Sequence, residues 1–112
     1  MLLFYKNLLY SLSVYKLKMK KKIYIIRNDL NNYVYIGSTV LELKRRFKWH
    51  YNSIYDTKKK NPMYRDMFGN FKNYKISLLH ECDTETRREL YEVEKKWIKY
   101  YKENNYNCYN IR

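Results

Sequence analysis

The sequence predicts a single small α/β domain of the α+β type, with three short strands and three helices along the chain. Two segments of alternating apolar residues flank an asparagine-rich turn, and a third such segment follows later. Two stretches with helical periodicity begin at residues that can cap a helix. A chain of 112 residues is long enough for one modest core and too short for two domains.

The first two strands are predicted at residues 23–27 and 33–37. With the loop placed at residues 28–31, Tyr24 pairs with Tyr35 and Ile26 pairs with Tyr33. The other face of this hairpin is then entirely aliphatic and consists of Ile23, Ile25, Val34 and Ile36. We expect the aliphatic face to be the core side and Tyr24 and Tyr35 to lie together on the opposite side, with Tyr33 shielding the hairpin.

A helix is predicted to begin at Thr39, because Thr39 and Glu42 have the spacing of a capping box. Its apolar stripe consists of Val40, Leu43, Phe47, Tyr51 and Ile54. At about 100° per residue, Arg46 and His50 lie one turn apart on one edge of this stripe, whereas Arg45 points toward solvent. We therefore expect Arg46 and His50 to extend past the hairpin.

The second helix is short, with Asn61-Pro62 at its start and Gly69 after its end, and residues 74–78 alternate as a third strand. The third helix is predicted to run from Thr86, which has capping-box spacing to Glu89, to about Lys102. Its apolar stripe consists of Leu90, Val93, Trp97, Ile98, Tyr100 and Tyr101.

Glu94 interrupts this apolar stripe, while the other acidic residues nearby, Glu85, Glu89 and Glu92, fall on the solvent side. A carboxylate on a buried face is costly unless a cation or a hydrogen-bond donor meets it. Glu94 is therefore a candidate functional acid. The alternative is a structural ion pair between Glu94 and Arg87.

The chain carries 24 Lys and Arg residues against 11 Asp and Glu residues, a formal net charge of +13. Such a charge attracts polyanions, of which nucleic acid is the commonest and an anionic membrane surface is the rival. Because Lys, Asn, Ile and Tyr all have A/T-rich codons, genome composition is an alternative source of part of this charge. Cys82 and Cys108 are too few for a disulfide framework or a zinc site, and they favour a reducing, intracellular setting.

Residues 1–18 are interpreted as an N-terminal extension, and residues 19–112 as the domain. The apolar run at the start is interrupted by Lys6 and Asn7, which argues against a signal peptide, and it is shorter than the roughly 20 residues that span a bilayer. Met19 offers a second start of translation. The alternative is a short amphipathic helix at a membrane surface, although we expect no membrane partner.

Five short segments follow one another along the chain: KIY at 22–24, YIG at 35–37 followed by Ser38, RFKWH at 46–50, EKKWI at 94–98 and YN at 109–110. Together they resemble the GIY-YIG nuclease family. The match extends from Ile23 to Ile111, and it resembles in particular the nuclease domain of phage homing endonucleases, here standing alone. The resemblance implies a small three-stranded antiparallel sheet flanked by helices.

The resemblance also implies a role for each matching residue. Tyr24 corresponds to a general base or a ligand of the attacking water, and Tyr35 to a residue that holds this water or the phosphate. Arg46 corresponds to the arginine that stabilises the phosphorane, and His50 to a histidine that assists proton transfer. A guanidinium suits this task because the attacked phosphodiester gathers negative charge on its non-bridging oxygens.

Two further residues and a metal ion follow from the same resemblance. Glu94 corresponds to the single metal-binding carboxylate, and Asn110 to an asparagine that supports the site. The ion is Mg²⁺ (or Mn²⁺), because Mg²⁺ accepts one or two carboxylates and takes its other oxygens from water and phosphate. The ordinary pKa of a phenol is about 10, so we expect the ion and Arg46 to lower the pKa of Tyr24. The residues expected to contact DNA are Lys22, Ser38, Arg45 and Lys48.

The sequence departs from the family pattern at two positions. Lys22 stands where the family usually has glycine, so the site would be altered if the backbone there needed a positive φ or a close approach to DNA. Cys108 stands where a glycine often precedes the final Tyr-Asn.

We therefore expect a metal-dependent endonuclease that hydrolyses DNA phosphodiester bonds. With no recognition segment after the domain, its intrinsic sequence specificity should be low. We expect a monomer whose partner is DNA, with no obligate small-molecule partner, and a second protein could bring it to its target. The rival interpretation is a catalytically impaired nucleic-acid-binding module of the same fold.

Overall fold

The computed structural model describes residues 20–110, and within this range four strands form one sheet. The strands are β1 (Lys21–Asn28), β2 (Tyr33–Thr39), β3 (Tyr74–Cys82) and β4 (Asn107–Cys108), in the spatial order β3-β1-β2-β4. Strand β1 is antiparallel to β2 and β3, whereas β4 is parallel to β2. The predicted extension at residues 1–18 and the last matched residue, Ile111, lie outside the described residues.

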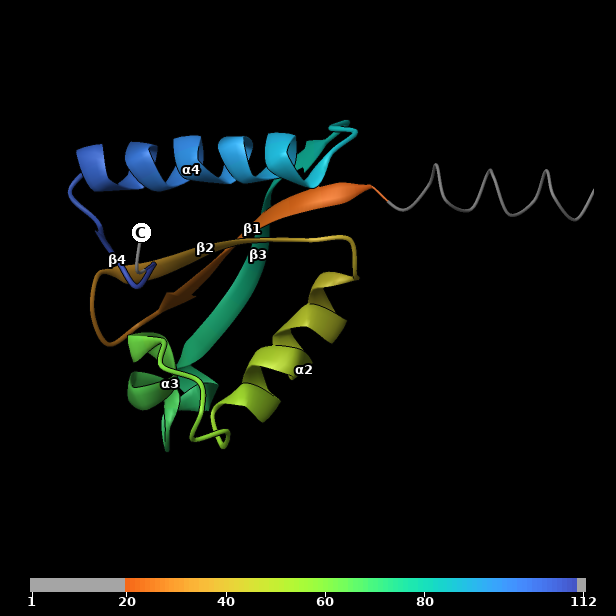
Figure 1. Cartoon of the computed structure of the whole chain (residues 1–112). Coiled ribbons are helices and arrows are strands. Elements are labelled where there is room, and N and C mark those ends of the chain that lie inside the picture. The colour runs from red at the N-terminus through yellow and green to blue at the C-terminus, as the bar shows by residue number, and fades with distance from the viewer. Residues whose placement is uncertain (1–19, 111–112) are drawn as a thin grey trace, which may run out of the picture.

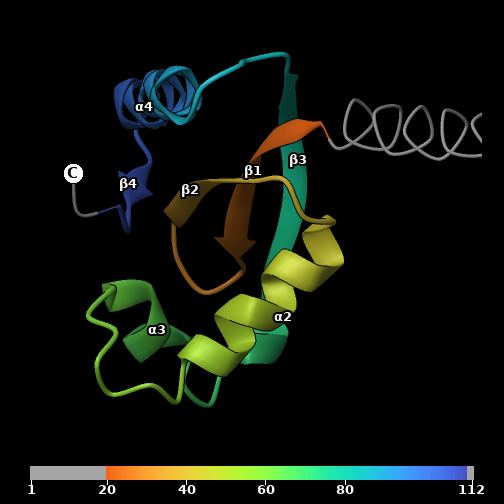
Figure 2. The same ribbon diagram turned by 45° about the vertical axis from the view of Figure 1, so that its right-hand side comes forward.

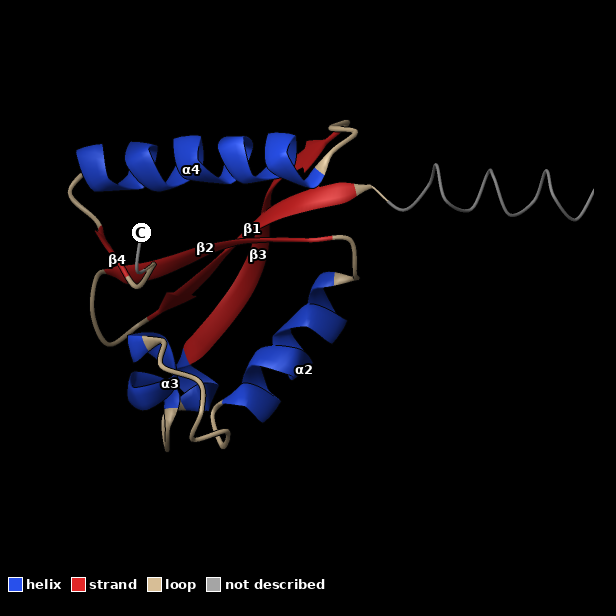
Figure 3. Ribbon diagram, viewed as in Figure 1, coloured by secondary structure: helices blue, strands red, loops and turns tan. Residues whose placement is uncertain are grey.

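Helices cover both faces of this sheet (Figure 1). They are α2 (Leu43–Ser53), α3 (Pro62–Met67) and α4 (Arg87–Glu103), with a single 3₁₀ turn, η1 (Phe71–Asn73), before β3. Helix α4 lies along one face, and α2 and α3 lie against the other, as the colouring by secondary structure in Figure 3 shows. The predicted α+β architecture is confirmed. The predicted number of strands, three, is wrong because β4 adds a fourth.

Both faces of the sheet are core, and the expectation of a single core side was wrong. Four successive residues of β1, Ile23 to Ile26, are at most 1% exposed. Ile23 and Ile25 pack with Leu90, Ile98 and Tyr101 under α4. On the other face, Tyr24 and Ile26 pack with residues of α3 and β3, namely Met63, Tyr64, Met67 and Tyr74. Tyr24, which we expected on the side opposite the core, is therefore completely buried.

The hairpin register is shifted by two residues from the predicted one, since Tyr24 pairs with Gly37 and not with Tyr35. The cause is Asn28, whose side-chain oxygen accepts two backbone hydrogen bonds from the loop and so keeps Asn28 at the end of β1. A shift of two residues leaves every side chain on its predicted face. Tyr24 and Tyr35 therefore still lie together, with ring centroids 6.3 Å apart.

Helix α2 begins later than predicted. Thr39 is the last residue of β2 and pairs with Lys22, and its hydroxyl accepts a hydrogen bond from the N–H of Leu41. The residue before the helix is Glu42, which makes no side-chain cap. The strand pairing of Thr39 therefore prevails over the capping-box pattern, and Val40 lies outside the helix and is 41% exposed.

The starts of the other two helices follow the sequence prediction. Asn61 caps α3 by accepting a hydrogen bond from the N–H of Met63, and Gly69 after it has a φ of +76°. Thr86 caps α4 by accepting a hydrogen bond from the N–H of Glu89. None of the helices between residues 20 and 110 is both long enough and apolar enough to cross a membrane.

Candidate active site

A pocket of about 480 Å³ lies between the end of β2, the start of α2 and the N-terminal half of α4. Figure 2 shows that the chain passes from the end of β2 through a short connection into α2. The residues that line the pocket include three of those singled out from the sequence, Ser38, Arg46 and Glu94. They belong to three different elements, so only the folded chain brings them together.

The hydroxyl of Tyr24 lies at the centre of a short series of polar contacts. Arg46 donates a hydrogen bond from Nε to this hydroxyl over 3.1 Å, and the hydroxyl lies 2.7 Å from Nε2 of His50. On its other side, Nδ1 of His50 lies 2.8 Å from the hydroxyl of Tyr64 in α3. A guanidinium, two phenols and an imidazole are therefore connected in one line.

The protonation of this series follows from burial. Burial is the main reason that the pKa of His50 is lowered to about 3, and the positive charges of Arg46 and Lys59 lower it further. His50 is therefore neutral near pH 7 and has one donating and one accepting nitrogen. Arg46 donates to the Tyr24 oxygen, so the Tyr24 hydroxyl hydrogen is available for His50. The contacts of His50 are all hydrogen bonds when Tyr24 donates to Nε2 and the N–H at Nδ1 donates to the Tyr64 oxygen.

In the protein without a bound ion, burial has a larger effect on the pKa of Tyr24 than Arg46 has. Burial raises the pKa of Tyr24, and the neighbouring Tyr35 raises it further. Arg46 lowers this pKa through its charge and its hydrogen bond, but by less. Tyr24 is consequently a neutral phenol whose hydrogen is directed at His50.

Gly37 makes room for the Tyr24 ring. A Cβ atom built on Gly37 would lie 2.9 Å from Cε1 of Tyr24 and closer still to Cζ and the hydroxyl oxygen, so no other residue fits here without displacing the ring. Tyr35 lies next to the same group, with its ring centroid 5.4 Å from that of His50. The tyrosine and glycine of the YIG segment thus border the Tyr24 hydroxyl from β2.

Arg46 is held from two sides. Its Nε contacts Tyr24, and its guanidinium carbon lies 4.2 Å from the centroid of the Trp49 ring. Lys59 contacts the same ring, with Nζ 4.5 Å from the centroid. A cation over an indole face is attracted by the ring and loses conformational freedom. Arg46 is therefore positioned before any substrate arrives.

Glu94 is buried, with only 5% of its surface exposed, and it projects from α4 into the pocket that Arg46 also lines. The predicted position of this carboxylate on the inner face of the helix is thus observed. Arg87, its alternative ion-pair partner, lines the same pocket. Among residues 20–110, no three His, Cys, Asp or Glu side chains lie close enough together to hold a metal ion by themselves. A single carboxylate in a water-accessible pocket suits Mg²⁺, which keeps most of its ligands as water or phosphate oxygens.

Asn110 does not line this pocket but is hydrogen-bonded to β2, the strand whose last residues do. Its side-chain oxygen accepts a hydrogen bond from the N–H of Ile36 over 3.0 Å, and its side-chain nitrogen donates to the carbonyl of Ile36 over 2.7 Å. The side chain of Asn110 thus makes the two hydrogen bonds to Ile36 that a residue of a neighbouring strand would make with its backbone. This pairing fixes Ile36 between Tyr35 and Gly37.

The structure divides the residues expected to contact DNA into two groups. Ser38 lines the active-site pocket, and Lys22 lies close to it, with its Nζ donating to the carbonyl of Leu41. Lys22 has the extended backbone of a strand residue, so a positive φ is not needed where the family has glycine. Arg45 and Lys48 line a separate pocket outside α2, over the rings of Phe47, Tyr51 and Phe71.

Sequence reasoning missed Tyr64 and Trp49. Tyr64 lies 14 residues after His50 in a different helix, and no local pattern marks it as a partner of the imidazole. Trp49 is three residues after Arg46 on the same helix, a spacing that brings side chains together and that could have revealed the stacking. Gly37 belongs to the YIG segment, but its close approach to the Tyr24 ring was not predicted.

Comparison with known proteins agrees with this geometry. Residues 20–107 match the family described as the GIY-YIG catalytic domain. The solved structure titled "Structure of the Catalytic Domain of Homing Endonuclease I-TevI" is 30% identical, with a TM-score of 0.66, over 83% of this chain and 99% of that one. A structure of a mutant of the I-TevI catalytic domain is also 30% identical, with a TM-score of 0.68, over 83% and 94% of the two chains. No curated protein matches the sequence. The match over most of the chain, together with the fold, shows that this protein belongs to the GIY-YIG nuclease family.

Proposed function

We propose that this protein is a divalent-metal-dependent endonuclease that hydrolyses DNA phosphodiester bonds. The observation that carries the proposal is the series from Arg46 through Tyr24 to His50, which lies beside the pocket containing the carboxylate of Glu94. Water must lose a proton to attack phosphorus, and the attacked phosphate gathers negative charge. Tyr24 and His50 can carry the proton away from the attacking water, and the guanidinium of Arg46 can pair with the negative charge of the phosphate.

In this mechanism the scissile phosphate occupies the pocket next to Arg46. A water oxygen forms the new bond to phosphorus and gives its proton to the Tyr24 oxygen, while Tyr24 passes its own proton to Nε2 of His50. The bond from phosphorus to the leaving sugar oxygen then breaks, and that oxygen takes up a proton from solvent. Tyr24 ends as it began, and His50 returns its proton to solvent through Tyr24.

The lowered pKa of His50 affects this transfer in two ways. At about 3 it keeps Nε2 unprotonated near pH 7, so that Nε2 can accept the hydrogen of Tyr24, but it also makes Nε2 a weak base before the substrate binds. The bound phosphate carries a negative charge beside Arg46, which offsets one of the cations that lower the pKa of His50. Substrate binding itself therefore makes His50 a better proton acceptor.

Arg46 stabilises the negative charge that develops on the non-bridging oxygens. Its Nε is engaged by Tyr24, and we assign the N–H groups of its two terminal nitrogens to the phosphate. Removal of one such donor typically slows a reaction about 10²- to 10³-fold. The stacking on Trp49 limits the entropy that Arg46 loses when it binds the phosphate.

We propose that Glu94 holds Mg²⁺ (or Mn²⁺), with water and phosphate oxygens as the other ligands. When bound, such an ion neutralises phosphate charge and lowers the pKa of a coordinated water. Tyr35 and Asn110 have organising roles: Tyr35 borders the Tyr24 hydroxyl, and Asn110 fixes the strand that carries Tyr35 and Gly37.

DNA affinity should come mainly from charge, and sequence specificity should be low. The formal net charge of +13 predicts binding that weakens steeply as salt is added. We assign Lys22 and Ser38 to the DNA next to the scissile phosphate, and Arg45 and Lys48 to a more distant part. One active site in a monomer predicts nicking of one strand at a time. The free thiols of Cys82 and Cys108 support a reducing, intracellular setting.

Nicking of supercoiled plasmid by the wild type in Mg²⁺ and in EDTA tests this proposal. Arg46→Ala should reduce nicking at least 10²-fold, whereas Arg65→Ala, which removes an exposed arginine of α3 outside the pocket, should retain it. The rival function is a nucleic-acid-binding module of the same fold. A folded wild type that shifts DNA in a gel and cuts none of it in Mg²⁺ or Mn²⁺ would favour that rival.

A further inference from the structure

Helix α4 carries a cationic edge that the proposed chemistry does not use. Successive residues of a helix are about 100° apart around its axis, and on this basis all basic side chains of α4 except Lys96 fall within a sector of about 120°. This sector lies next to the buried stripe, on the side of the active-site pocket. We call this set the basic edge, and it consists of Arg87, Arg88, Lys95, Lys99 and Lys102, all exposed. Three other acidic residues of the helix, Glu89, Glu92 and Glu103, follow next around the helix together with Lys96, on the side of the basic edge away from the buried stripe.

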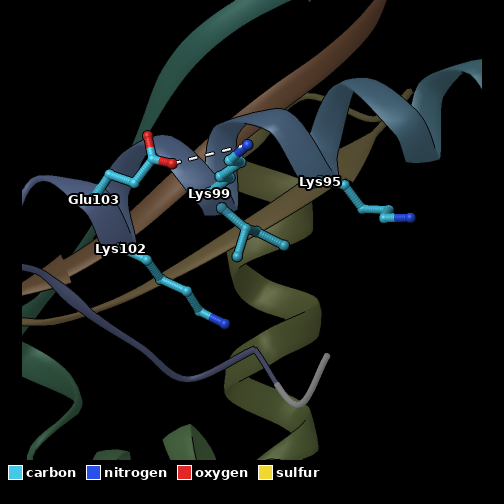
Figure 4. Close-up of a pocket in the computed structure, with 5 residues that line it drawn as sticks. Lys95, Lys99, Lys102 and Glu103 are labelled. Atoms are coloured by element: carbon cyan, nitrogen blue, oxygen red, sulfur yellow. Dashed lines mark ion pairs between the residues drawn. The ribbon is translucent and has the colours of Figure 1, made fainter.

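The basic edge begins at the active site and leads away from it. Arg87 lines the active-site pocket together with Glu94, and Lys95, Lys99 and Lys102 line a second pocket two turns further along α4. Figure 4 shows Lys95 and Lys102 projecting from the same side of the helix, whereas Lys99, which lies between them along the helix, is turned toward Glu103. At about 1.5 Å per residue, Arg87 and Lys102 are roughly 22 Å apart along the helix axis.

We propose that the basic edge of α4 binds the sugar–phosphate backbone of duplex DNA on one side of the scissile phosphate. The position of the scissile phosphate rests on the proposed function. One strand of duplex DNA presents a phosphate about every 3.4 Å of axis, so the basic edge spans about six nucleotides. The arrangement therefore fixes the direction in which the DNA leaves the active site.

Two observations favour a phosphate backbone over other partners. Lys95 lies 3.8 Å from Glu92, and Lys99 lies 3.9 Å from Glu103, but these ion pairs are exposed, and such pairs contribute little and exchange readily for a phosphate. Among the described residues that line this second pocket, Ile98 alone is apolar, and it is 5% exposed. The other lining residues are three lysines and Glu103, so the pocket carries a net positive charge, which favours a polyanion.

The test is binding of a 20-base-pair fluorescein-labelled duplex of arbitrary sequence in EDTA, measured by anisotropy over a range of salt concentrations. The test variant is the double substitution Lys95→Gln and Lys102→Gln. The control is Lys96→Gln with Lys75→Gln, which removes the same charge from exposed positions outside the basic edge. Circular dichroism confirms that both variants are folded.

A plot of log K against log salt should be less steep for the test variant by about 1.8, because the variant no longer neutralises two phosphates and each contributes about 0.9 to the slope. At 0.1 M salt the test variant should therefore bind about 60-fold more weakly than the wild type. The control should match the wild type. Equal weakening in both variants, or in neither, would overturn the basic edge as a DNA-binding surface.

Because EDTA prevents metal-dependent cleavage, this result is independent of the nuclease activity. If the wild type cuts no DNA and the test variant alone loses affinity, the proposed function fails and the basic edge stands as a binding surface. If the wild type cuts DNA and the two variants bind alike, the basic edge fails and the proposed function stands. For a nuclease with this surface, the test variant should raise KM for nicking and leave kcat unchanged.

Discussion

The burial of His50 predicts that the protein loses stability as the pH falls from 7 to 5. In the folded protein the pKa of His50 is lowered to about 3, whereas in the unfolded chain it returns to its ordinary value of 6.5. The unfolded state therefore binds a proton below about pH 6.5 that the folded state does not bind until about pH 3. The stabilising contribution is complete above pH 6.5 and is lost progressively below it.

The size of the effect follows from these two values. Near pH 5 the difference is close to one proton, which gives a slope of about 1.4 kcal/mol per pH unit. Integrated from pH 7 to pH 5, it amounts to about 2 kcal/mol, a large fraction of the 5–15 kcal/mol that typically stabilises a domain. Carboxylates add their own pH dependence, so the contribution of His50 has to be isolated by a variant.

Urea unfolding at pH 7 and at pH 5 measures this contribution. His50→Gln should lose about 2 kcal/mol less than the wild type between the two pH values, although it is less stable at pH 7 because its contacts with Tyr24 and Tyr64 are altered. His80→Gln replaces the other, exposed histidine and should behave as the wild type. Equal losses in the wild type and in His50→Gln would refute the reasoning, as would an NMR titration of the His50 ring with a midpoint near 6.5.

Three further substitutions test the support of the site. Gly37→Ala should displace the Tyr24 ring and reduce nicking at least 10²-fold in a protein that still folds; full activity would contradict the close packing at Gly37. Asn110→Ala leaves a backbone N–H and a carbonyl of β2 without this partner and should cost about 1–3 kcal/mol in urea unfolding, and an unchanged midpoint would rule out the pairing. Tyr64→Phe keeps the ring but removes the partner of Nδ1, so it should slow nicking more than it changes DNA binding in EDTA; an equal effect on both would count against the series.

Local patterns predict much of this fold, because alternation and capping act over a few residues. Alternation placed Tyr24 and Tyr35 on one face, and helical spacing placed Glu94 on the inner face of α4. The two-residue shift in register depends on one side chain, Asn28, and leaves the faces unchanged. For this reason the residues of the site could be predicted even though the pairing of the strands was wrong.

Other features depend on contacts that no local pattern encodes. Strand β4 has two residues, too few to show a periodicity, and it forms because Asn105 with a φ of 71° reverses the chain after α4. Thr39 could pair in a strand or cap a helix, and its pairing with Lys22 decides between the two. The contact between His50 and Tyr64 exists only once α3 packs on the sheet.

The most direct test of the central claim compares two glutamates of α4. Glu94 is buried in the active-site pocket, whereas Glu92 is exposed two residues earlier on the same helix. Initial rates of plasmid nicking should be measured over a range of Mg²⁺ concentrations for Glu94→Gln and Glu92→Gln, each with its folding checked by circular dichroism. The account predicts that Glu94→Gln abolishes nicking at every Mg²⁺ concentration and that Glu92→Gln retains the wild-type rate. Nicking by folded Glu94→Gln with the Mg²⁺ dependence of the wild type would contradict it.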